Sequence, residues 1–106
     1  LIHQFVIVIN QTFNVSEQLH TDWMAWMKST YLPNLMASGN FLHYKMFRLK
    51  SEMPEEGNTY AVQFMQSVLL FNSEQNDILF QKFEMYVREK YGDQVLFFRT
   101  ILEEVL

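Results

Sequence analysis

The chain has 106 residues, of which 49% are hydrophobic and 19% charged, with ten Phe, five Tyr, two Trp and seven Met. This composition is typical of a globular protein and excludes a disordered chain, and the length suits one domain over residues 1–106. The formal net charge is −4 and the eight Lys and Arg residues are scattered. Because nucleic-acid affinity depends on clustered basic residues, we expect no nucleic-acid partner.

Membrane insertion and secretion are also not expected. No apolar run approaches the roughly 18 to 20 residues of a membrane-spanning helix, and the opening LIHQFVIVIN lacks the basic segment and small-residue cleavage site of a signal peptide. The chain contains no cysteine, which excludes disulfides, thiolate metal ligands and a Cys nucleophile and fits a reducing compartment. We predict a cytoplasmic protein.

The first half of the chain predicts a strand followed by an interrupted helix. Residues 2–12 are rich in β-branched residues with an apolar centre, as in a strand covered on both sides. A helix follows, capped by Asn14 in a capping box or by Ser16. Pro33 should interrupt this helix one or two residues before itself, and Gly39 should close the following turn in a left-handed conformation.

The second half predicts a hairpin, a helix and a last strand. Residues 41–50 and 59–71 alternate as strands, and SEMPEEGN between them supplies turn residues. Asn72 or the serine after it caps a helix that Gly92 ends, and residues 94–106 form a strand. The order βαββαβ, without an internal repeat or linker, predicts an α+β ferredoxin-like domain, an antiparallel four-stranded sheet with two helices on one face.

A helical wheel at about 100° per residue places the apolar side chains of the first helix in one arc centred on Trp23 and Met27. This pattern is typical of a helix laid on a sheet, so Trp23 and Trp26 are expected in the core. His20 and Tyr31 lie toward one flank of the arc, eleven positions apart and on similar bearings. Their polar tips either complete the core or reach a ligand.

Both faces of the predicted sheet are apolar, which differs from the apolar and polar faces of a solitary ferredoxin-like domain. In the last strand Leu96 and Phe98 point to one side, and Val95 and Phe97 point to the other. Stacking the uncovered face on the same face of a second subunit would bury it. We therefore predict a homodimer of the dimeric α+β barrel type, joined through the open sheet face.

Polar residues on these strands are the candidates for a binding site, namely His43, Lys45, Gln63 and Arg99. Facing the space between sheets, they would be the convergent polar groups of a small-molecule pocket. Equally, they could pair with one another or with the partner subunit. Arg99 needs a carboxylate or a ligand if it is buried. The candidate contacts for a small, partly apolar or anionic ligand are His20, Trp23, Trp26, Tyr31, His43, Gln63 and Arg99.

Other chemical signatures are missing from the sequence. The three histidines have neither metal-ligand spacing nor an attendant acidic cluster, so we predict no metal site. The glycines are isolated at turns, and no GxSxG motif presents a serine nucleophile. GNTYAVQF does not match the aromatic signature of RNA-recognition domains. We predict no cofactor and assign no catalytic residue.

The sequence nevertheless resembles a family of small bacterial proteins, the domain-of-unknown-function family 4286. Its most specific part is the stretch H-x-x-W-x-x-W-M-K with the following proline and S-G-x-F turn, matched by His20, Trp23, Trp26, Met27, Lys28, Pro33, Ser38, Gly39 and Phe41. In the family pattern a histidine commonly precedes the I/L-P step, where this chain has Tyr31. A chemical role for that histidine would not carry over to this chain. The family has no established activity, so no catalytic residue is inherited.

The resemblance implies a ferredoxin-like fold similar to dimeric α+β barrel proteins, some of which are cofactor-free monooxygenases or haem-degrading enzymes. That last step is an analogy between folds. Three functions therefore compete. The leading one is a homodimer that binds a small molecule, the second is a cofactor-free monooxygenase or haem-degrading enzyme, and the third is a non-catalytic dimerisation or interaction module.

Overall fold

The computed structural model describes residues 5–50 and 58–106, and its elements follow the predicted order. The four strands are β1 (Val6–Val15), β2 (His43–Arg48), β3 (Asn58–Ser67) and β4 (Val95–Glu103). They form one antiparallel sheet in the order β2-β3-β1-β4, with β1 and β3 in the centre. The expected start of the first strand and most of the predicted hairpin turn lie outside the described residues.

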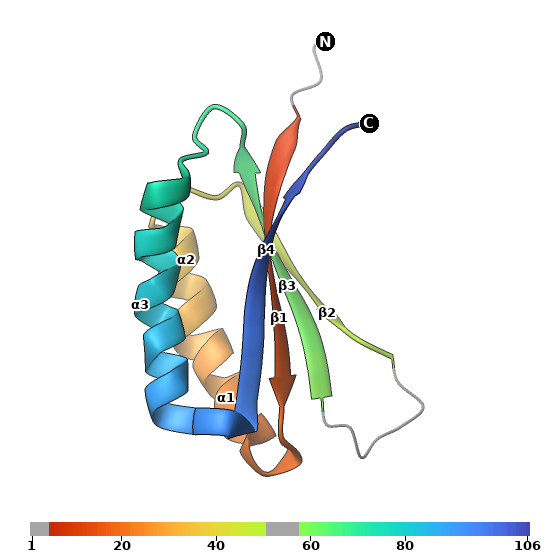
Figure 1. Cartoon of the computed structure of the whole chain (residues 1–106), viewed down its shortest axis with the longest axis vertical. Helices are drawn as coiled ribbons and strands as arrows, with labels where there is room; N and C mark the ends of the chain where they lie inside the picture. Colours follow the sequence, from red (N-terminus) through yellow and green to blue (C-terminus); the bar gives the residue numbers. More distant parts are fainter. Residues whose placement is uncertain (1–4, 51–57) are drawn as a thin grey trace.

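The helices lie on one face of this sheet (Figure 1). They are α1 (His20–Trp26), α2 (Leu32–Ala37) and α3 (Ser73–Tyr91), with a π-helical turn at Met27–Tyr31 and short 3₁₀ turns at Glu17–Leu19 and Gly92–Gln94. The π-helical turn joins α1 to α2, so together they form the predicted first helix. No helix of the described residues is long and apolar enough to cross a membrane.

The start of the first helix differs from the prediction. β1 remains paired with both of its neighbours as far as Val15, so Asn14 lies in the strand and cannot cap a helix. Its side-chain amide donates to Thr59 Oγ1 at 2.9 Å instead. Ser16 precedes only the 3₁₀ turn, and its hydroxyl bonds Gln94 rather than a backbone N–H. Strand pairing therefore prevails over the capping signal.

The interruption near Pro33 is a wider helical turn and not a break. The Leu32 N–H donates to the Met27 carbonyl five residues before it. Pro33 lacks an N–H, and in a continuous α-helix its ring would collide with the carbonyl of Ser29. The π turn accommodates this ring without ending the helix. Gly39 then follows α2 with φ 78°, in the left-handed region that was predicted for it.

The second predicted helix agrees closely with α3. Asn72 caps it, because the Gln75 N–H donates to Asn72 Oδ1 at 3.0 Å, and Gly92 follows its last residue with φ 56°. β3 ends at Ser67, earlier than predicted, where the Leu70 N–H bonds the Ser67 carbonyl in a turn.

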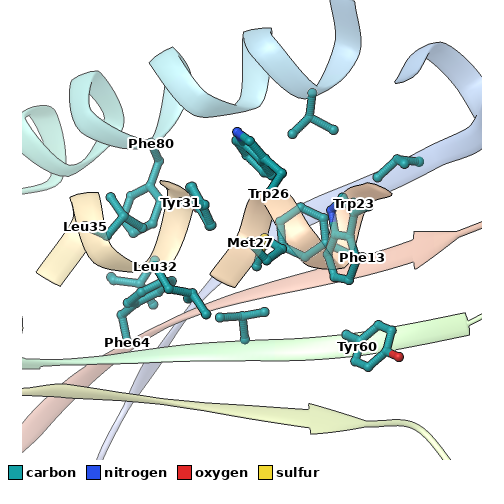
Figure 2. Close-up of a cluster of buried hydrophobic side chains, with 14 of the residues drawn as sticks. Phe13, Trp23, Trp26, Met27, Tyr31, Leu32, Leu35, Tyr60, Phe64 and Phe80 are labelled. Carbon is teal, nitrogen blue, oxygen red and sulfur yellow. The ribbon is translucent and has the colours of Figure 1, made fainter. Parts of the chain in front are cut away.

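The core lies between the helices and one sheet face, which we call the covered face (Figure 2). Its strand residues alternate with those of the opposite, open face, as the burial of β1 and β3 shows. Trp23, Met27 and Leu35 from the helices pack there with Phe13 and Phe64, and each of these side chains is buried. Large rings of this kind each remove roughly 150 to 250 Å² from water.

Candidate functional site

A chain of polar side chains crosses the apolar core between the sheet and α3. The Tyr31 hydroxyl donates to Gln11 Oε1, and Gln11 Nε2 donates to Glu84 Oε2 at 3.2 Å. Arg99, which pairs with Gln11 across β1 and β4, donates from Nε to Glu84 Oε2 at 3.0 Å and from Nη1 to Asp77 Oδ1 at 2.8 Å. We call Tyr31, Gln11, Glu84, Arg99 and Asp77 the polar network.

Three members of this network, Tyr31, Gln11 and Glu84, are buried, whereas Arg99 is partly buried and Asp77 is exposed. Glu84 stands on the apolar stripe of α3, between Phe80 and Val87, and is 8% exposed. Burying a polar group is unfavourable unless a hydrogen bond replaces its water, and the network supplies those bonds. Burial also raises the pKa of Tyr31 well above its usual value near 10, so Tyr31 remains a hydrogen-bond donor at neutral pH. Burial opposes the charge of Arg99, but its bonds to Asp77 and Glu84 raise its pKa.

Beside the network, α3 and β4 enclose a cleft of about 430 Å³. It is lined by Gln81, Glu84, Met85, Arg88 and Arg99. The Arg88 guanidinium lies over the Phe97 ring at 5.0 Å from its centroid, and that of Arg99 lies over Phe80 at 5.1 Å. Arg99 is thus a predicted site residue that lines a cavity, and the cavity lies between helix and sheet.

The two tryptophans and Tyr31 belong to the core. Trp23 is fully buried beside Phe13 and Tyr60, with ring centroids 5.3 Å from each, and its indole N–H has no hydrogen-bond partner among the described residues. Trp26 stacks between Tyr31 and Tyr86, at 5.1 and 5.0 Å. Figure 2 shows Trp26 directed toward α3 and Trp23 beside Phe13. For these three residues the core interpretation holds.

His20 and Tyr31 do not form a pair, although the helical wheel gave them similar bearings. His20 Nε2 lies 2.6 Å from the Tyr60 hydroxyl, in a hydrogen bond, and the two rings stack at 5.6 Å. Tyr31 instead reaches Gln11 on β1. The π turn follows α1 and ends at Tyr31, and it changes the phase of the helix between His20 and Tyr31, which a uniform 100° wheel cannot include.

The remaining predicted residues, His43 and Gln63, lie on the open face with Lys45. The strand register aligns the side chains of the open face in rows that run across all four strands. The middle row consists of Lys45, Gln63, Asn10 and Thr100. The row on one side of it consists of His43, Met65, Val8 and Leu102, and the row on the other side consists of Phe47, Ala61, Thr12 and Phe98. Arg99 lies on the covered face, so the structure does not bring the four polar strand residues into one pocket.

Several functional candidates were missed by reading the sequence. Gln11, Asp77 and Glu84 were not singled out, yet they hold Arg99 and Tyr31 in place. The available signal was a carboxylate on the apolar stripe of a helix and an amide between Ile9 and Phe13. Within the described part of the chain, no group of three or more His, Asp or Glu side chains could hold a metal ion.

Comparisons with known proteins identify the family and the fold. The model of the family "Domain of unknown function (DUF4286)" matches residues 6–105. A dimeric ferredoxin-like protein from an uncultured marine organism is 12% identical, with a TM-score of 0.55 over 97% of this chain and 98% of that one. A candidate monooxygenase from Shewanella loihica PV-4 is also 12% identical, with a TM-score of 0.51 over 98% of each chain. A search of curated proteins found no match. At this identity, the two structures establish the ferredoxin-like fold alone.

Proposed function

The chain belongs to the DUF4286 family of domains of unknown function, and on that premise we propose that it is a homodimer that binds a small molecule in the cleft between α3 and β4. The observation that carries the binding proposal is the convergence of Gln81, Arg88 and Arg99 in one cavity beside a buried carboxylate. Small-molecule sites are concave and orient the ligand with a few convergent polar groups; in this cleft Met85 supplies the apolar contact and the rest of the lining is polar. The cleft volume of about 430 Å³ falls within the usual range for such sites.

The polar network supports the proposal because it holds one wall of the cleft in place. Arg99 is bound through three of its nitrogens, to Glu84 and Asp77. Gln11 and Tyr31 in turn hold Glu84 from the core. A side chain restrained in this way loses little conformational entropy when a ligand binds.

The open face supports the dimer. It carries exposed apolar side chains, including Phe98 at 59%, Phe47 at 49% and Leu102 at 47%. A twofold axis would place this patch on its own copy and bury it. The similar protein from the marine organism is described as dimeric. Lys45 and Gln63, which have no hydrogen-bond partner among the described residues, would then meet polar groups across the seam and define its register.

The dimer is tested by placing a charge on the open face. We expect sedimentation velocity at about 20 µM to show a dimer for the unmodified chain and a monomer for Phe98→Glu, because a dimer seam would desolvate the new carboxylate. The far-UV circular dichroism spectrum of Phe98→Glu should be unchanged. The matched control is Ile78→Glu, an exposed apolar residue of α3, which should remain dimeric. A monomeric unmodified chain at this concentration would overturn the dimer.

Ligand binding is tested by nuclear magnetic resonance with a panel of small organic fragments. We expect the amide resonances that shift to cluster at residues 81–88 and 97–101. Met85→Trp fills the rim of the cleft and should remove these shifts, whereas Ile78→Trp, about two turns of α3 before Met85 and outside the cleft lining, should retain them. A panel that shifts resonances only outside the cleft, or none, would contradict the binding proposal.

The other predictions from the sequence remain predictions. A cofactor-free monooxygenase or haem-degrading activity is tested by oxygen uptake with quinol substrates and by colour in the purified protein. The similarity to a candidate monooxygenase supports the fold on which that alternative depends. The cytoplasmic location, the single domain over residues 1–106 and the non-catalytic interaction module are equally open to experiment.

A further inference from the structure

We infer that the ligand of the α3–β4 cleft is a small organic oxyanion, a carboxylate or phosphoryl group on an apolar body, held between Arg88 and Arg99. This inference rests on the proposed binding function and names the chemistry of its ligand. It follows from the balance of donors, acceptors and charge in the cleft lining.

The lining offers N–H donors and few free acceptors. Arg99 has five N–H groups, and three of its nitrogens each direct one to Glu84 or Asp77, which leaves one hydrogen on Nη1 and one on Nη2. Both oxygens of Glu84 already accept hydrogen bonds, from Arg99 and Gln11. The guanidinium of Arg88 has no carboxylate or hydrogen-bond partner among residues 5–50 and 58–106. A ligand that fits this lining must bring acceptors.

The charge of the lining points the same way. Arg88 and Arg99 contribute two positive charges against the single carboxylate of Glu84. Asp77 does not line the cleft, but it pairs with Arg99 at 2.8 Å, so Asp77 and Glu84 together offset the charge of Arg99. Arg88 is the cation of the lining without a carboxylate partner among the described residues, although the whole chain carries a net charge of −4. An anion is attracted by Arg88, and a cation would be repelled by it.

Aromatic rings hold both guanidinium groups in orientation. Arg88 lies over Phe97 and Arg99 over Phe80, at 5.0 and 5.1 Å. A ring under the flat face of a guanidinium leaves its N–H edge available, and that edge matches the paired oxygens of a carboxylate or phosphoryl group. Two arginines in this arrangement favour an oxyanion over a halide, which has no paired oxygens.

The ligand must also have an apolar part. Met85 lines the cleft and is 57% exposed, and its thioether adapts to irregular apolar groups. A bare inorganic ion would leave this side chain in water. An aryl or alkyl group carrying the oxyanion covers Met85 while its oxygens meet the arginines.

The test uses chemical-shift titration of the full chain with four aryl probes, which are phenyl phosphate, benzoate, benzyl alcohol and benzylamine, and with inorganic phosphate, which lacks the apolar part. We expect phenyl phosphate or benzoate to shift resonances at residues 81–88 and 97–101, and the tighter of the two assigns the group as phosphoryl or carboxylate. Inorganic phosphate should bind at least tenfold more weakly, and the neutral and cationic probes should not bind the cleft.

Matched variants separate a specific site from general attraction to positive charge. Arg88→Met keeps an apolar side chain over Phe97 and lies outside the polar network, so it should fold normally and lose at least tenfold in affinity for the better oxyanion. Lys82→Met removes an exposed cation of the same helix, which lies over Phe83 at 5.9 Å, and should change the affinity by less than twofold. Equal losses in both variants would overturn the inference.

The outcomes distinguish this inference from the function on which it rests. Binding of benzyl alcohol or benzylamine in the cleft without binding of an oxyanion would overturn the anion chemistry and leave the cleft as a binding site. Inorganic phosphate that binds as tightly as phenyl phosphate would overturn the organic part. If all five probes fail while a fragment of the panel binds the cleft, the inference is wrong and the proposed function stands.

Discussion

Polar residues on the two faces of the sheet differ in how they are hydrogen-bonded within the chain. On the covered face, Gln11 and Arg99 are engaged in the polar network, and Gln66 forms reciprocal amide bonds with Asn76 at 2.9 and 3.3 Å. On the open face, Lys45 and Gln63 occupy comparable places in the middle of their strands and have no partner among the described residues. Asn10 of the open face does bond within the chain, to Thr12 and Thr100, so the contrast applies to Lys45 and Gln63, whose polar groups remain available to water.

This difference follows from burial. A polar group under a helix has lost its water and must find a partner in the protein, so the network belongs to the folding of each subunit. Polar groups on the open face retain water in the monomer and impose no such requirement. The contrast teaches that substitutions of polar residues on the two faces should have different consequences for the stability of the chain.

The largest expected effect comes from removing the centre of the polar network. Glu84→Ala leaves Arg99 and Gln11 without their shared acceptor, and breaking one side of a buried ion pair costs about 3 kcal/mol of unfolding free energy. Urea denaturation should show this loss. Glu89→Ala, an exposed carboxylate of the same helix, is the control, and a similar loss in both variants would mean that the network does not stabilise the covered face.

The same substitution on opposite faces tests the comparison directly. Gln11→Leu leaves the Tyr31 hydroxyl without its acceptor and Glu84 without one of its donors, and should lower the free energy of unfolding by about 2 kcal/mol, while Gln63→Leu should change it by less than about 0.5 kcal/mol. Both are measured in the Phe98→Glu background, so that dimerisation does not contribute. Equal destabilisation by the two variants would remove the distinction between the faces.

Tyr31→Phe should cost about 1 kcal/mol at neutral pH, because Gln11 Oε1 loses its donor. The gap between this variant and the unmodified chain should also depend on pH. Burial raises the pKa of Tyr31 well above 10 in the folded state, so its contribution is fully present below the unfolded pKa near 10 and is lost as pH rises above it. Ionisation of Tyr31 in the unfolded chain shifts the gap by about 1.4 kcal/mol for each pH unit above 10, so a gap of about 1 kcal/mol should close by about pH 11 and then reverse. Denaturation at pH 8 and pH 11 that shows a constant gap would contradict the buried position of this hydroxyl.

The smallest effect is expected at a surface contact outside both faces. Asp22 accepts from the Tyr91 hydroxyl at 2.9 Å and pairs with Lys90 at 3.3 Å. The bond from Tyr91, followed by that from Lys90, lowers the pKa of Asp22 below its usual 3.8. Its stabilisation is therefore present above that value and is lost as pH falls through the folded pKa. Between pH 5 and pH 2 the melting temperature of Asp22→Asn should fall slightly less than that of the unmodified chain. At pH 7 the two melting temperatures should be almost equal. A marked loss at pH 7 would show that this contact matters more than its exposure indicates.

Much of the fold was predictable because its signals are local. The cap at Asn72, the positive φ of Gly39 and Gly92 and the alternation of β3 each depend on residues close in sequence. The capping signal at Asn14 misled because it is also local, whereas the pairing that keeps Asn14 in β1 is made with β3 and β4. The π turn escaped the helical wheel because a wheel assumes one uniform pitch.

The candidate site was only partly predictable. The need of Arg99 for a carboxylate was evident from the sequence, but the identity of that carboxylate was not. Glu84 lies 15 residues from Arg99 and 73 from Gln11, and no periodicity links these positions. Arg99 is separated from His43 and Gln63 because they point to opposite faces of the sheet. Which residues of each strand face the helices is decided by the tertiary structure.

By itself, the sequence determined the elements, their order and the apolar character of both sheet faces, because periodicity and caps act over a few residues. Only the tertiary structure decided which polar groups meet, which face is covered and where a cavity remains. Strand register and the place of α3 over the sheet set these features, and each depends on contacts between distant segments. The polar network and the donor-rich cleft exist because the folded chain brings Gln11, Tyr31, Glu84 and Arg99 together.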